Sequence, residues 1–138
     1  MIEHRTFKRL EIPLPLKMRL LGTGHYVPIK ALTKNVSLEG LLIEAQVFLE
    51  DGSLLIWKGE ESVKLDPFLV LDEKLIELDI WLPPKSEKIR ATGRVIWYDL
   101  GSKGTSYYFR VGVSLEKMGV LDGKRWVNFV KNIVEAEG

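Results

Sequence analysis

The chain has 138 residues, of which 46% are hydrophobic and 28% charged, and its formal net charge is +1. Length and composition are typical of one soluble globular domain with a single core. The near-neutral charge excludes a general attraction to nucleic acid or membrane, and the lack of cysteine excludes disulfides and thiolate metal sites.

The N-terminal segment, residues 1–10, is polar and basic and has too few apolar groups to pack. We therefore expect a mobile arm when nothing is bound to it. Over residues 11–20 apolar and polar residues alternate, which predicts a strand with one buried face. Pro13 and Pro15 fall on the opposite face, so this strand should lie at an edge or the prolines at its start.

Several further runs have the composition of strands and are bounded by turn residues. They lie at residues 27–36, 40–45, 47–49, 54–57, 75–82, 89–98 and 107–115. The Asp51-Gly52 step between two of them predicts a hairpin. Residues 59–67 are predicted to be a charged connection, and the glycine-containing stretch 99–104 a loop.

The C-terminal segment has a different periodicity. Asp122 is a predicted N-cap, and Trp126, Phe129, Val130 and Ile133 follow at helical spacing. We expect one amphipathic helix at about 122–136 that closes one side or end of the β structure. Strands followed by a single helix predict a mainly β barrel or sandwich with a helical lid, in one domain over residues 11–138.

Motifs for catalysis or cofactor binding are missing from the sequence: no glycine-rich phosphate loop before a helix, no paired His–Glu metal motif and no nucleophile elbow. With only two histidines, a His-rich metal centre is not expected. Tryptophans 57, 81, 97 and 126 lie mostly on apolar faces and are predicted to pack in the core. We therefore predict neither an enzyme nor a bound cofactor.

Targeting signals are missing as well. No apolar run approaches the length that crosses a bilayer, and the N-terminus lacks the hydrophobic stretch of a signal peptide. Together with the missing cysteine, this predicts a cytoplasmic protein without membrane insertion.

Two short patterns stand out, Arg5-Thr-Phe-Lys-Arg9 and Asn35-Val-Ser37-Leu-Glu-Gly40. Taken singly, the first is also typical of a solvated basic tail. The second is also typical of a strand-to-strand turn in which Asn or Ser bonds the backbone and Gly supplies an unusual φ. In this order, the two patterns resemble the PilZ domain family, whose hallmark is Arg-x-x-x-Arg before the first strand and Asp/Asn-x-Ser-x-x-Gly after the second.

Other segments extend the resemblance over nearly the whole chain. Gly93-Arg-Val-Ile-Trp97 and Tyr108-Phe-Arg-Val-Gly112-Val resemble two strands of the family, and a C-terminal helix follows as it does there. The resemblance implies an antiparallel six-stranded split β-barrel with a C-terminal α-helix. It departs at about residues 46–66 and 22–30, where this chain is longer than is usual in the family.

The resemblance also implies that the chain binds cyclic di-GMP through Arg5, Arg9, Asn35, Ser37 and Gly40. The residue chemistry agrees, because a guanidinium group binds phosphate with two hydrogen bonds, matches guanine O6 and N7, and stacks on a purine. Asn35 can pair with a guanine edge, and Ser37 with a guanine or a phosphate. Gly40 allows a close backbone approach.

Lys8 is expected near a phosphate, although a solvated lysine is an equally good reading of it. Ligand binding would draw the arm against the 35–40 turn, and an unidentified protein partner would recognise the altered surface. One alternative is a ligand-independent interaction adaptor of the same fold. Another is a small β-barrel that binds single-stranded nucleic acid, which needs a basic groove with exposed aromatics. The net charge of +1 argues against that, so no DNA or RNA partner is expected.

Overall fold

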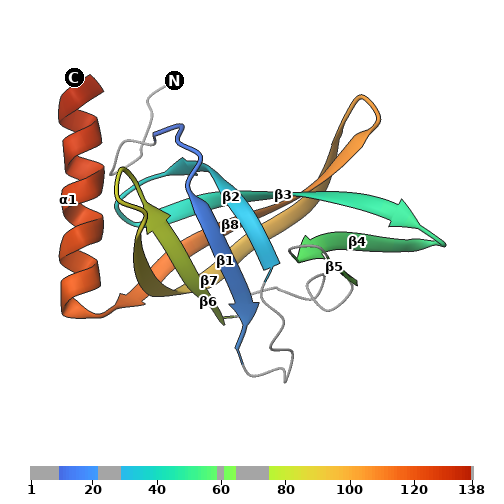
Figure 1. The fold of residues 1–138 in the computed structure, drawn as a ribbon, viewed down its shortest axis with the longest axis horizontal. Helices are drawn as coiled ribbons and strands as arrows, with labels where there is room; N and C mark the ends of the chain where they lie inside the picture. The colour runs from blue at the N-terminus through green and yellow to red at the C-terminus, as the bar shows by residue number, and fades with distance from the viewer. Residues whose placement is uncertain (1–9, 22–28, 59–60, 65–74, 138) are drawn as a thin grey trace.

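A computed structural model describes residues 10–21, 29–58, 61–64 and 75–137. Strands and one helix make up most of these ranges (Figure 1). In chain order they are β1 (Pro15–Leu20), β2 (Ile29–Val36), β3 (Gly40–Glu50), β4 (Ser53–Lys58), β5 (Glu61–Lys64), β6 (Leu75–Leu82), β7 (Glu87–Lys103), β8 (Ser106–Met118) and α1 (Val120–Glu137).

The strands close into a barrel because their hydrogen bonding runs in a ring. The order β2-β1-β6-β7-β8-β3 is antiparallel throughout, and β3 pairs again with β2. Closure leaves these six strands without a free edge. Strands β4 and β5 extend the sheet outward from β3 as a separate ribbon, visible on the right of Figure 1. The predicted six-stranded antiparallel barrel with a C-terminal helix is confirmed.

The predicted alternation determines which side chains enter the barrel. Leu16 and Met18 of β1 and Leu78 and Ile80 of β6 are all at most 2% exposed. The strand β1 pairs with a neighbour on each side, and Pro15 is its first residue. Of the two places predicted for the prolines, the start of the strand is therefore the observed one.

The hairpin at Asp51-Gly52 is confirmed, since both residues have positive φ, 51° and 78°, as a two-residue type I′ turn requires. Other predicted boundaries are wrong. The strand β3 is continuous where two runs were predicted, and β5 lies within the predicted connection 59–67.

The predicted loop 99–104 is also wrong, because β7 and β8 pair as far as Lys103 and Ser106. Asp99 faces Arg110 across this ribbon, and the rings of Tyr98 and Phe109 lie 6.1 Å apart. Such cross-strand pairs stabilise a ribbon beyond the barrel, and they depend on a register that the sequence does not display.

The helix α1 begins at Val120 rather than at residue 122, so Asp122 lies in its first turn and is not its N-cap. Instead, Asp122 accepts a hydrogen bond from the backbone N–H of Arg90 at 3.0 Å and joins the helix to β7. The predicted apolar stripe is confirmed, because Trp126 and Val130 are each 2% exposed.

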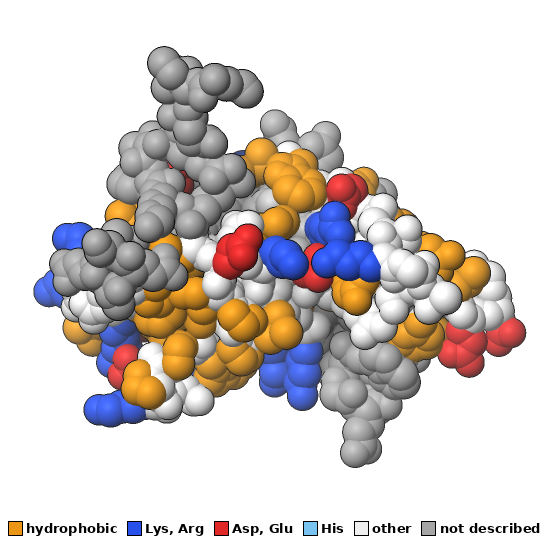
Figure 2. All heavy atoms as spheres, turned by 90° about the horizontal axis from the view of Figure 1, so that it is seen from above, with side chains coloured by type: hydrophobic (Ala, Val, Ile, Leu, Met, Phe, Trp, Pro, Cys, Tyr) orange, Lys and Arg blue, Asp and Glu red, His pale blue; other side chains and the backbone are white. Residues whose placement is uncertain are grey.

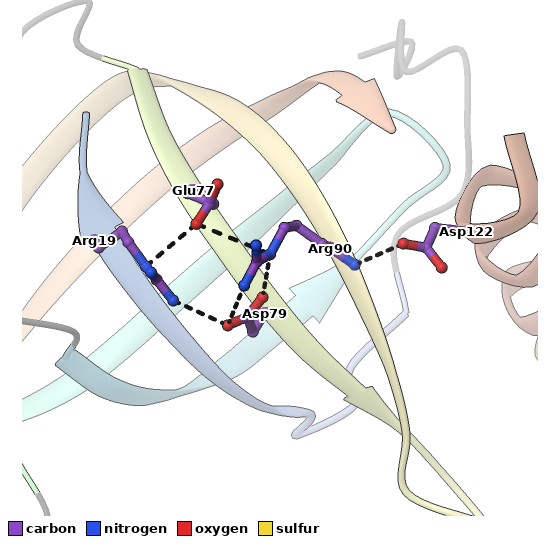
Figure 3. A network of polar contacts seen from close by, with 5 residues as sticks. All are labelled: Arg19, Glu77, Asp79, Arg90 and Asp122. Atoms are coloured by element: carbon purple, nitrogen blue, oxygen red, sulfur yellow. Dashed lines mark hydrogen bonds and ion pairs between the residues drawn. The ribbon is translucent and has the colours of Figure 1, made fainter. Parts of the chain in front are cut away.

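A network of charged residues on the outer surface of the barrel continues this connection (Figure 3). Asp79, whose side chain is only 7% exposed, accepts hydrogen bonds from Arg90 at 2.9 Å and Arg19 at 3.2 Å, and Arg19 also pairs with Glu77 at 3.3 Å. Burial alone would raise the pKa of Asp79, but the hydrogen bond and charge of Arg90, with the charge of Arg19, bring it below its ordinary value. The network therefore fastens β1, β6, β7 and the helix together.

Candidate functional site

The turn between β2 and β3 carries the second sequence motif, and its backbone is held from two directions. Leu10 and Val36 exchange two backbone hydrogen bonds of 2.8 Å, which places the end of the N-terminal arm beside the turn. From the other side, the Leu115 N–H of β8 donates to the Glu39 carbonyl at 2.9 Å. Within the turn, the Ser37 N–H donates to the Gly40 carbonyl at 2.9 Å.

The helix holds the same turn from a third direction. The buried indole N–H of Trp126 donates to the carbonyl of Leu38 at 3.2 Å. A residue of α1 therefore contacts the centre of the motif directly, although 88 positions separate the two in the sequence.

A cavity of about 360 Å³ lies against this turn on the outer wall of the barrel. Its polar walls and its aromatic wall come from different parts of the chain. The lining includes Asn35, Ser37, Glu39 and Gly40 from the turn, and Ile96, Trp97, Gly112 and Ser114 from β7 and β8. Its size lies within the range typical of small-molecule sites.

The aromatic wall is Trp97, which is 45% exposed, so the prediction that it packs in the core is wrong. The register of β7 shifts between Val95 and Trp97. Such an irregularity reverses the alternation that places Val95 inside the barrel. The indole lies against the backbone of Gly112, where a Cβ atom would come within 2.4 Å of its Nε1. Trp97 is thus a site residue that the sequence analysis missed.

The other tryptophans agree with the prediction only in part. Trp126 is buried in the core as predicted, whereas Trp81 is partly buried on the outer face of β6, and the side chain of Trp57 lies outside the described residues.

Gly40 permits a close backbone approach, and the neighbour it approaches is β8. A Cβ atom at this position would lie 2.6 Å from the Val113 carbonyl oxygen. Gly40 is not among the residues with positive φ in the described chain, so an unusual turn conformation is not its role. It brings β3 and β8 together directly beneath the cavity.

Arg5, Lys8 and Arg9 lie outside the described residues, but the point from which they extend is defined. Leu10, predicted to be the last residue of the arm, is 1% exposed and lies in the core. Leu10 is bonded to Val36, and the two neighbours of Val36, Asn35 and Ser37, line the cavity, so the described chain begins beside the proposed site.

The described parts of the chain offer no cluster of metal ligands, and the face of the molecule in Figure 2 shows no basic groove. No group of three or more His, Cys, Asp or Glu residues that could hold a metal occurs among the described residues. On the face shown in Figure 2, lysine and arginine side chains are scattered among hydrophobic and acidic ones rather than gathered along one groove. Over the same described ranges, no helix is both long and apolar enough to span a bilayer.

The family to which this fold and motif belong is shown by comparison. The model of the PilZ domain matches residues 3–132, and the chain belongs to the PilZ domain family. No curated protein matches the chain.

Solved structures of low sequence identity share the fold. The inhibitor of motility of Bacillus subtilis, MotI/DgrA, has a TM-score of 0.58 at 17% identity, over 97% of this chain and 53% of its own. MrkH of K. pneumonia, solved with c-di-GMP, has a TM-score of 0.66 at 12% identity, over 99% of this chain and 55% of its own. The PilZ domain of YcgR from Escherichia coli, also with c-di-GMP, has a TM-score of 0.62 at 8% identity, over 98% of this chain and 95% of its own. This chain thus spans about half the length of the first of these proteins.

Proposed function

We propose that this protein is a receptor for cyclic di-GMP and that the cavity beside the β2–β3 turn is its binding site. The observation that carries the proposal is the meeting of the motif residues Asn35 and Ser37 with the exposed ring of Trp97 in one cavity, next to the anchored end of the arginine arm. The family membership supports it, as do similar structures that contain this nucleotide.

The ligand's parts match the walls of the cavity. Trp97 offers a flat surface for stacking a guanine, an interaction worth about 1–3 kcal/mol per base. Asn35 and Ser37 supply short hydrogen-bonding groups elsewhere in the lining. Arg5 and Arg9 would close over the ligand from the arm and pair with its phosphates, with Lys8 close by. No chemical step is part of this function, and no metal or cofactor takes part.

The signal would be a change of surface. In our proposal the arm, residues 1–9, closes on the ligand against the turn, and the new surface formed by arm and barrel binds a downstream protein. Because Leu10 is bonded to Val36, this closure takes place next to the binding site. As a receptor for an intracellular nucleotide, the protein would act in the cytoplasm.

Isothermal titration of the full chain with cyclic di-GMP tests the proposal. We expect a dissociation constant of about 1 μM, and weaker binding by about 2 kcal/mol or more, roughly 30-fold, for Arg5→Ala and Arg9→Ala, because each loses a charge-assisted pair with phosphate. Lys131→Ala is the matched control, since it removes a positive charge from an exposed position on α1. No binding by the unaltered chain at high ligand concentration would refute the receptor function. A partner that binds regardless of nucleotide and of the arginines would favour the adaptor alternative.

A further inference from the structure

The proposed site contains one acidic side chain that the motif does not account for. Glu39 lines the cavity and is exposed, and its carboxylate has no hydrogen-bond or ion-pair partner within the described ranges. Its backbone is nevertheless held, because its carbonyl accepts a hydrogen bond from Leu115. The side chain therefore starts from a defined place at the cavity wall.

A carboxylate in a site for a ligand with two phosphates needs a compensating interaction. Like charges about 8 Å apart repel by about 0.5 kcal/mol in water and by more near a protein surface. Guanine offers such an interaction, because N1–H and the N2 amino group present two donors side by side on its Watson–Crick edge. An ionised carboxylate only accepts, and its two oxygens can take both donors.

We propose that Glu39 binds the Watson–Crick edge of the guanine that stacks on Trp97, and that it makes the site select guanine over adenine. The inference rests on the proposed function. Trp97 and Glu39 line the same cavity, so a base lying on the indole has its edge within the space that Glu39 borders. Adenine would turn one acceptor, N1, toward the carboxylate and lose one of the two hydrogen bonds.

The other polar side chains of the cavity are less restricted than a carboxylate. The amide of Asn35 and the hydroxyl of Ser114 can each donate or accept, so they adapt to either purine, and the hydroxyl of Ser37 donates to the Gly40 carbonyl at 3.4 Å. Among the side chains that line this cavity, an ionised Glu39 is the one restricted to accepting, and that restriction disfavours a base that presents an acceptor.

The test is a binding cycle that alters protein and ligand separately. Unaltered chain, Glu39→Gln and Glu50→Gln are titrated with cyclic di-GMP, cyclic di-IMP and cyclic di-AMP. Hypoxanthine, the base of cyclic di-IMP, keeps N1–H and lacks the N2 amino group. Glu50→Gln removes the same charge from an exposed position at the far end of β3, about 30 Å along the strand from Gly40.

We expect Glu39→Gln to lower the affinity for cyclic di-GMP by about tenfold or more, because the interaction of the carboxylate with the guanine N2 amino group is weakened. The affinity for cyclic di-IMP, which has no such amino group, should fall clearly less. The preference over cyclic di-AMP should shrink to the same degree, and Glu50→Gln should change none of these ratios. Equal weakening of all three ligands, no change, or tighter binding by Glu39→Gln would overturn the role of Glu39 and leave the receptor function intact. If the unaltered chain binds none of the ligands, both proposals fail.

Discussion

Gly112→Ala tests whether the proposed site depends on where Trp97 lies, because Gly112 has no side chain of its own and the added methyl group would collide with the indole. The new methyl carbon would lie 2.4 Å from Nε1 of the indole, whereas ordinary contacts begin at 3.4 Å, so the ring must move by about 1 Å or tilt away from β8. Stacking contributes about 1–3 kcal/mol per base, and losing most of it corresponds to a fall in affinity for cyclic di-GMP of about 5- to 150-fold.

The assay is isothermal titration of Gly112→Ala, Trp97→Ala and the double variant, with thermal unfolding to confirm that each is folded. Because both changes act on the same ring, their effects should not add, and the double variant should bind about as weakly as Trp97→Ala. Unchanged affinity in Gly112→Ala would refute the stacking role of Trp97. A loss that is just as large when Trp97 is already absent would show that the methyl group acts through the barrel instead.

Three further changes probe the supports of the site. Thr33→Val removes a buried hydroxyl that accepts a hydrogen bond from the Leu14 N–H at 2.7 Å. It should lower the free energy of unfolding, measured in urea, by about 1–3 kcal/mol, whereas Thr33→Ser keeps the hydroxyl and should lower it less. The pKa of Asp79 is lowered in the fold despite its burial, so its ionised form contributes stability above its ordinary pKa of 3.8 and this is lost as the pH falls through the lowered value. Asp79→Asn should therefore flatten the fall in melting temperature as the pH drops below about 3.8. Trp126→Phe deletes the hydrogen bond to Leu38 and should weaken cyclic di-GMP binding as well as stability, and an unchanged affinity would contradict a link between helix and turn.

The sequence predicted the barrel well where hydrophobic alternation is unbroken. The strands β1 and β6 alternate without interruption, and their inward-facing hydrophobic residues are buried. Alternation is a local signal, and a closed barrel converts it directly into burial. It failed at Trp97, because a register shift just before that residue reverses the faces and depends on the pairing of β7 with β8.

In the candidate site too, the residues of a local motif could be predicted, whereas those that depend on strand register could not. Asn35, Ser37 and Gly40 are close in sequence and could be found as one motif. Trp97 and Gly112 enter the site through the register of two other strands, which is a property of the assembled sheet. Leu10 was misplaced because a single leucine after a polar stretch carries no periodicity, although its backbone bonds to Val36 make it part of the barrel.

Two of the attachments of the turn, to the helix and to Leu10, suggest how a bound nucleotide would be sensed. Ser37 borders the cavity, and the next residue, Leu38, gives its carbonyl to Trp126 of the helix. On the arm side, Val36 is bonded to Leu10. A ligand that moves Ser37 would therefore strain the contact of Leu38 with the helix on one side of it, and the contact of Val36 with Leu10, the residue after the arm, on the other. Since such coupling needs no chain of intermediate residues, arm and helix should respond together, and a partner that contacts both would distinguish the bound state from the free one.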